Sequence, residues 1–247
     1  MKREKTGYSI IIVLALISII GLFFIPPMEQ DPSYHNFCDS KTVFNIPNFW
    51  NVVSNVPFLI LGLVGVIKAL KFTESRTLYI IFFTGIALVS LGSGYYHLNP
   101  NNNTLVWDRL PMTIAFMSLF SIVVSEFISP KKGNKLLFPA LIIGVFSVLY
   151  WQYFNDLRIY ALVQFYPILV IPVILICFSS RYTKTYGYWG LSIAYFIAKV
   201  FEHFDKEVDV LLGGISGHPL KHLFASLGIL CLFYSYLKRK KVKTSLD

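Results

Sequence analysis

Eight apolar stretches, each about as long as a membrane-spanning helix, constrain the fold of this chain more than any motif does. They cover residues of about 8–26, 50–70, 78–96, 110–128, 136–154, 159–178, 186–204 and 219–237. A helix needs about twenty apolar residues to cross the hydrocarbon core of a bilayer. With 55% hydrophobic and only 14% charged residues in 247 positions, the chain is too apolar for a soluble domain. We therefore predict an all-α integral membrane protein.

The first apolar stretch differs from the others because it follows the basic segment MKREK, as the core of a signal peptide does. No small-residue cleavage site precedes Ile25, Pro26 and Pro27, so we interpret it as an uncleaved anchor helix. Three parts follow from this interpretation. They are a cytoplasmic tail with its anchor helix (1–30), a seven-helix domain (31–237) and a basic cytoplasmic tail (238–247).

Positive charge is distributed unevenly between the two sides of the predicted bundle. Most of the 22 Lys and Arg residues fall on one side, in segments 2–5, 68–76, 131–135, 181–184 and 238–243. Lys and Arg beside short loops are retained on the cytoplasmic side, so both termini are predicted to be cytoplasmic. The net charge of +9 is then explained by retention and by anchoring to the bilayer surface, and nucleic-acid binding is not expected.

Five polar residues are predicted to meet at the opposite, extracytoplasmic ends of the helices. His218 and His222 are four residues apart, as are Ser93 and His97, so each pair shares one face of a helix. Two imidazoles of one helix with a third from another make a three-ligand zinc site with one open position. Asp108 begins the apolar part of the next helix at the same level. The pattern indicates a metal hydrolase embedded in lipid.

Each of these residues also has a simpler interpretation. Ser93 fits a helix serine that bonds a carbonyl of the preceding turn, and Asp108 fits a helix cap. His35 is interpreted as a polar group at the membrane interface, whereas His203 is the rival to the three proposed metal ligands. These alternatives stay open at the level of the sequence.

Two further polar clusters enter the predicted helices. Asn48, Asn51 and Asn55 follow helical spacing, which predicts a hydrogen-bond network facing protein. Lys199 and Glu202 share a face, and because ionisable groups in a membrane are costly unless paired, we expect them to form a buried ion pair. Asn51, Asn55, Lys199 and Glu202 are thus expected to support the site from behind.

The three cysteines are not predicted to form any site. Cys38, Cys177 and Cys231 are widely spaced, and the last two lie inside apolar stretches. Neither a disulfide framework nor a thiolate metal site is indicated.

Four short motifs carry a family resemblance. NIPNFWNVVSN, GSGYYHLNP, WDRLPM and GHPLKH follow one another in this order, and from about residue 37 to 237 the chain resembles the alkaline ceramidases. These belong to the CREST superfamily of seven-helix membrane hydrolases, which also contains the progestin and adipoQ receptors. The anchor helix before Pro26 lies outside the seven-helix core of that family.

The resemblance implies a fold and a chemistry. His97, His218 and His222 would bind zinc, Ser93 would lie beside the metal-bound water and the substrate oxygen, and Asp108 would move protons. The substrate would be an N-acylated sphingoid lipid in the membrane, hydrolysed to a sphingoid base and a fatty acid. The acidic calcium-binding loop of alkaline ceramidases is not matched, because FCDSKTVFNIPNFWN offers only Asp39, which speaks against regulation by calcium.

Two other classes of function remain open. A lipid or hormone receptor with structural zinc would match the receptor branch of the superfamily, although the short cytoplasmic loops favour an enzyme. A haem or quinone protein would use His97, His203 and His222 as axial ligands. Within the enzymatic hypothesis, hydrolysis of a different membrane lipid is also open.

Overall fold

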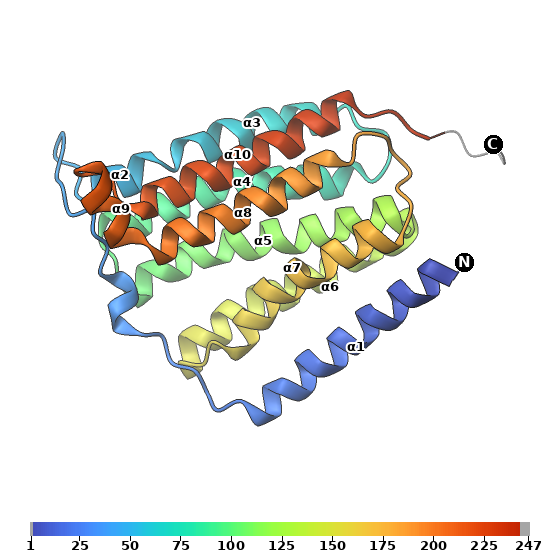
Figure 1. Cartoon of the computed structure of the whole chain (residues 1–247), viewed down its shortest axis with the longest axis horizontal. Helices are drawn as coiled ribbons and strands as arrows, with labels where there is room; N and C mark the ends of the chain where they lie inside the picture. Colours follow the sequence, from blue (N-terminus) through green and yellow to red (C-terminus); the bar gives the residue numbers. More distant parts are fainter. Residues whose placement is uncertain (1, 243–247) are drawn as a thin grey trace.

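The computed structural model describes residues 2–242, which form a helical bundle without strands in that range (Figure 1). The long helices are α1 (Lys2–Phe24), α3 (Val56–Ala69), α4 (Arg76–Leu98), α5 (Asn102–Phe127), α6 (Pro130–Phe154), α7 (Arg158–Cys177), α8 (Tyr186–His203) and α10 (Gly217–Lys238). Three short elements join them: the 3₁₀ helix η1 (Pro32–His35), α2 (Phe49–Val53) and α9 (Asp205–Leu212). The predicted all-α class is confirmed.

Seven helical segments of the described chain are long and apolar enough to cross a membrane. One of them combines α2 and α3, and the others are α1, α4, α5, α6, α7 and α10. The eighth predicted span, α8, is present as a helix of 18 residues packed along α10 but falls outside this group. Lys199 and Glu202 near its end lower its apolar character.

The second predicted span is not one continuous helix. α2 ends at Val53 and α3 begins at Val56, with Pro57 at the second position of α3. A proline inside a helix removes one backbone hydrogen bond and clashes with the preceding turn, so the chain breaks before it. Apolar length alone does not reveal this break, which places Ser54 and Asn55 at a corner instead of on a smooth helical face.

The fourth predicted span begins earlier than hydropathy suggests. α5 starts at Asn102, where the Asn101 side chain accepts hydrogen bonds from the backbone N–H groups of Asn103 and Thr104. The Thr104 hydroxyl in turn accepts one from the Asn101 N–H, which completes a capping box. Asp108 therefore lies in the second turn of α5, and its interpretation as a helix cap is wrong.

Both ends of the described chain lie at the same end of the bundle, which we call the terminal end (Figure 1). The basic segments that flank α3–α4, α5–α6 and α7–α8 all fall at this end. α4 finishes and α5 and α10 begin at the opposite end, which we call the histidine end. This arrangement agrees with the predicted grouping of the basic residues and does not by itself define which side of a membrane they face.

The N-terminal helix lies at the edge of the bundle, against α7. Arg158 fixes its lower end in Figure 1, because its guanidinium donates to the carbonyl oxygens of Leu22 (2.9 Å) and Ile25 (2.7 Å) while pairing with Asp156. Cationic groups near the last carbonyls stabilise a helix end. Because α1 already begins at Lys2, the predicted N-terminal tail is helical from that residue onward.

The basic C-terminal segment is only partly the surface tail that the sequence predicts. The Arg239 side chain is only 8% exposed, forms an ion pair with Glu126 and lies over the rings of Tyr182 (4.2 Å) and Tyr236 (4.6 Å). Lys241 pairs with Glu74 at 2.8 Å. The segment therefore ties α10 to the rest of the terminal end, while residues 243–247 lie outside the described residues.

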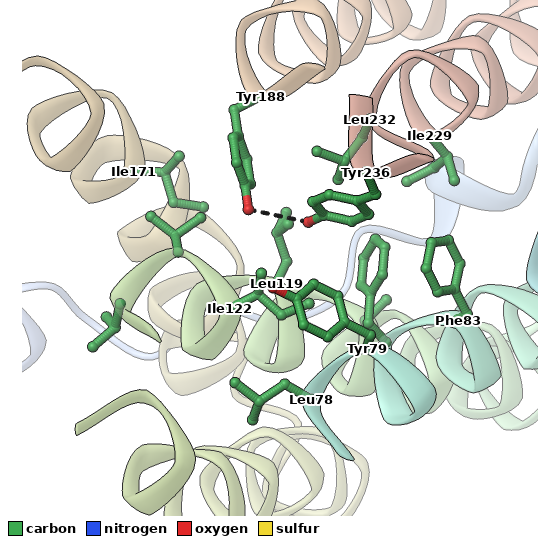
Figure 2. Packing of buried hydrophobic residues seen from close by; sticks show 14 of the residues in the cluster. Leu78, Tyr79, Phe83, Leu119, Ile122, Ile171, Tyr188, Ile229, Leu232 and Tyr236 are labelled. Atoms are coloured by element: carbon green, nitrogen blue, oxygen red, sulfur yellow. Dashed lines mark hydrogen bonds between the residues drawn. The ribbon is translucent and has the colours of Figure 1, made fainter. Parts of the chain in front are cut away.

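The hydrophobic core fills the middle of the bundle between α4, α5, α7, α8 and α10. Figure 2 shows Leu119 and Ile122 of α5 facing Tyr79, Tyr188 and Tyr236, and the last two share a hydrogen bond of 3.2 Å. Buried tyrosines need a partner for the hydroxyl, and this pair supplies it. The core lies between the terminal end and the histidine end of the bundle.

Candidate metal centre and active site

Three buried histidines meet at the histidine end. His97 in the last turn of α4 lies beside His218 and His222 in the first two turns of α10, and potential ligand nitrogens of the three rings all lie within 4.8 Å of one another. The ring centroids are 4.9 to 5.1 Å apart. The structure thus brings together the three histidines that the sequence analysis proposed as ligands.

The donor set fits a zinc ion. Nδ1 of His97 and Nε2 of His218 are buried without a hydrogen-bond partner in the described chain, which is costly for a polar atom unless something else binds it. Nδ1 of His222 lies 2.8 Å from the Ser54 hydroxyl, which itself donates to the Asn51 carbonyl. Nδ1 of His222 also lies 3.3 Å from the Asn55 amide nitrogen, so the polar contacts of this ring in the described chain are all made through Nδ1. Nε2 is left available for a metal, as in metal-binding histidines. Three neutral imidazoles are ligands that zinc accepts.

The segment between η1 and α2 covers the histidines. The Phe37 ring packs against His218 at 4.3 Å and His97 at 4.8 Å between centroids. Asp205, the first residue of α9, accepts hydrogen bonds from the backbone N–H groups of Cys38 (3.0 Å) and His218 (2.6 Å). It thereby joins this segment to the start of α10.

Cys38 lies close to the histidines without being a ligand. Burial and the neighbouring Asp205 carboxylate raise the pKa of the Cys38 thiol to about 11. In the described chain the Cys38 sulfur does not join the group of potential metal ligands.

The other two histidines lie apart from the cluster. His203, the rival ligand, is exposed and packs on Phe204. His35 bonds the Tyr96 hydroxyl at 2.8 Å and the Asn102 side chain at 2.9 Å. In the described chain neither joins the group of potential metal ligands.

Ser93 and Asp108 face each other beside the histidines. Ser93 lies one turn from His97 on α4, and its side chain is near enough to the Asp108 carboxylate on α5 to interact with it. No hydrogen bond to a carbonyl of its own helix is found for Ser93 in the described chain, so the simpler interpretation of this serine is not supported. Both residues, with His222, line one cavity.

The cavity has a volume of about 570 Å³, in the range of ligand sites. Its polar end lies at the histidine end, and its walls become apolar toward Leu119, Ile171 and Tyr188 of the core. Tyr188 and Glu202 both line it from α8, which gives a length of about 20 Å at 1.5 Å per residue. A long apolar chain with one polar end matches this shape.

The four residues expected behind the site divide into two groups. Asn51 is fully buried and its backbone N–H donates to Asp39, while the Asn55 side chain donates to the Asn51 carbonyl. Asn55 also contacts Nδ1 of His222 at 3.3 Å. Both polar atoms of the Asn51 side chain and Oδ1 of Asn55 have no hydrogen-bond partner in the described chain, so the predicted side-chain network is only partly formed. Lys199 and Glu202 form the expected ion pair, but both line the cavity, and Lys199 is 40% exposed, so the pair is not fully buried.

One comparison with known proteins identifies the family. The family model described as Ceramidase matches residues 29–207, which is more than two thirds of the chain. The chain belongs to the ceramidase family. A search of the curated proteins finds no match. His218 and His222 follow the residues matched by the ceramidase model, so their convergence with His97 is an independent structural observation.

Sequence reasoning missed two charged residues of the ceramidase cavity. Lys221 lies between the two histidines of α10 and pairs with Glu202 at 3.0 Å. Arg109 follows Asp108 on α5 and is buried. Both line the cavity. The sequence did contain a signal, because Lys221 is adjacent to His222 and Arg109 is adjacent to Asp108. Adjacent helix residues diverge by only about 100°, so both members of such a pair can line one cavity.

Proposed function

We propose that the chain is a zinc-dependent amide hydrolase that works inside the membrane on N-acyl lipids, as a ceramidase releasing a sphingoid base and a fatty acid. The observation that carries this proposal is the position of the buried histidine cluster beside Ser93 and Asp108 at the polar end of an apolar cavity. Membership of the ceramidase family supports hydrolysis of a lipid amide.

The residues of the cavity have distinct roles in the proposed reaction. A zinc ion bound by His97, His218 and His222 would supply a Lewis acid for the carbonyl and for water. The Asp108 carboxylate accepts the proton of the attacking water and returns it to the nitrogen of the leaving amine. The Ser93 hydroxyl turns from Asp108 to donate to the carbonyl oxygen as negative charge develops there.

The shape of the cavity supports a position for the reacting bond beside the polar residues. An amide beside Ser93 and Asp108 leaves the acyl chain in the apolar part that ends near Tyr188. A lipid amide lies at the interface between headgroups and hydrocarbon, which is where the first turns of membrane helices lie. The histidine end, one or two turns from the ends of α4 and α10, is at a matching depth.

The proposed orientation puts the active site on the extracytoplasmic side of the membrane. The terminal end carries the basic segments, and such segments stay in the cytoplasm. Both termini are then cytoplasmic, with α1 as an anchor helix before the hydrolase domain of residues 31–237. The substrate would reach the cavity from the bilayer.

Asp108→Asn provides the test of this function. The change keeps the size of the side chain in the second turn of α5 and removes the base. Purified wild-type protein is expected to release fatty acid and base from an N-acyl sphingoid lipid, as measured by mass spectrometry, and the variant to lose nearly all turnover while keeping its metal and folding normally. Full turnover by zinc-loaded Asp108→Asn protein would exclude Asp108 as the proton carrier. A zinc-loaded wild type without any lipid amidase activity would favour the receptor hypothesis.

A further inference from the structure

Arg109 is a buried cation that the proposed reaction does not use. It follows Asp108 on α5, is 6% exposed and lies over the rings of Trp151 (4.0 Å) and Tyr160 (4.6 Å). Its Nη2 donates to Gln30 at 2.6 Å, whereas its Nη1 has no hydrogen-bond partner in the described chain. The aromatic rings offset part of the cost of burying this charge.

No carboxylate within residues 2–242 pairs with Arg109. Glu202, the other acid of the cavity wall, is shared by Lys199 and Lys221. The charged side chains that line the cavity are thus Arg109, Lys199 and Lys221 against Asp108 and Glu202, an excess of positive charge. An unpaired buried cation is strongly unfavourable, and a guanidinium is suited to binding planar carboxylate or phosphate groups.

The position of Arg109 relates it to the reacting bond. Consecutive residues on a helix diverge by about 100°, so Asp108 faces Ser93 on α4 while Arg109 faces Trp151 and Tyr160 on α6 and α7. Both line the same cavity. A lipid whose amide lies beside Asp108 would therefore have its headgroup, next to that amide, on the side of the cavity where Arg109 lies.

We propose that Arg109 binds an anionic oxygen group, a carboxylate or phosphate, on the headgroup of the lipid that occupies this cavity. The inference rests on the proposed amide hydrolysis and predicts that, among N-acyl lipids, those with an acidic headgroup are the preferred substrates. The same chemistry is present in the carboxylate of the released fatty acid, and two separate measurements distinguish these sources.

The first measurement compares two N-acyl sphingoid lipids that differ only in a phosphate on the primary hydroxyl. Wild-type protein is expected to have the higher kcat/KM for the phosphorylated lipid. Arg109→Gln should lower the ratio of the two values by roughly 10- to 100-fold, the range expected for losing a charged hydrogen bond. Arg109→Lys keeps the charge but not the planar guanidinium, so its ratio should lie between those of the wild type and Arg109→Gln. Lys206→Gln, on the exposed surface of α9, should leave the ratio unchanged.

The second measurement uses no turnover. Displacement of a fluorescent fatty acid from the purified protein is followed with a long-chain fatty acid and with its methyl ester. Arg109→Gln could weaken binding of the fatty acid but not of its methyl ester while leaving the kcat/KM ratio of the two lipids unchanged. That result would assign the anion site to the product and overturn the headgroup assignment. Thermal unfolding of each variant shows that it is folded.

An unchanged ratio together with unchanged fatty-acid binding in folded Arg109→Gln and Arg109→Lys would overturn the anion site itself. If the wild type cleaves neither lipid, the proposed hydrolase function fails instead. The displacement measurement then still decides whether Arg109 binds an anion.

Discussion

The hydroxyl of Ser93 and the carboxylate of Asp108 lie on facing helices, beside the histidines of α10. Ser93→Ala removes only the hydroxyl, so zinc and substrate should still bind. Turnover should fall roughly a hundredfold, the size expected for losing one donor to a developing oxyanion. The measurement is kcat for lipid amide hydrolysis together with the metal content of the same sample.

Ser226→Ala is the matched control for that change. Ser226 is also a buried helix serine, but its hydroxyl bonds only the Leu223 carbonyl of its own helix. It should keep wild-type turnover. If Ser93→Ala also stays within about twofold of the wild type, Ser93 is not the oxyanion donor.

The residues of the site were predictable to different degrees. The histidines follow from sequence because a spacing of four on a helix fixes a shared face, and matching ends of predicted helices bring His97 to that face. Arg109 did not follow, because a charge beside an apolar stretch is read as a loop residue. The capping box at Asn101 shows that α5 begins before the apolar stretch of about 110–128, so that Arg109 belongs to the helix and not to the loop.

The helices α4 and α5 approach closely where they present Ser93 and Asp108. A Cβ added at Gly92 would lie 1.9 Å from the Trp107 carbonyl oxygen, immediately before Asp108. Gly92→Ala should therefore push the two helices apart, cost about 1–3 kcal/mol of stability and reduce turnover. Thermal unfolding and kcat of the purified variant measure both effects.

Gly94, on the other side of Ser93, provides the control for Gly92. A Cβ at Gly94 meets nothing within 4 Å, and alanine is the better helix former, so Gly94→Ala should be as stable as the wild type or slightly more so. Equal stability and turnover for the two variants would contradict the close packing of α4 on α5.

At the scale of elements, apolar length predicted the long helices but missed the break before Pro57 and the short helix α9. The corner at Ser54 and Asn55 depends on Pro57, and a length criterion does not register a proline within an apolar run. The short helix α9 is polar at its start and therefore invisible to hydropathy. Yet Ser54 and Asp205 from these two places hold His222 and His218.

The whole molecule has one basic end and one end with the histidines, which predicts its orientation in the membrane. Cysteines introduced singly at Asn102 and Lys206 lie at the histidine end, whereas one at Lys132 lies at the terminal end. An impermeant maleimide applied to sealed cells should label the first two and spare the third, because Lys and Arg remain cytoplasmic.

The labelling needs a background in which the three native cysteines are replaced by alanine. Permeabilised cells serve as the control, since there all three positions should react. Labelling of Lys132→Cys in sealed cells, with protection of Asn102→Cys, would reverse the proposed orientation and place the active site on the cytoplasmic side.

The metal content of the purified protein tests the proposed site most directly. Elemental analysis should find about one zinc per chain, and His97→Ala, His218→Ala and His222→Ala should each lose the metal together with activity. His35→Ala should keep both, since His35 bonds only Tyr96 and Asn102. A wild-type protein that hydrolyses lipid amides without zinc, or a His203→Ala variant that loses zinc while His97→Ala retains it, would contradict this assignment.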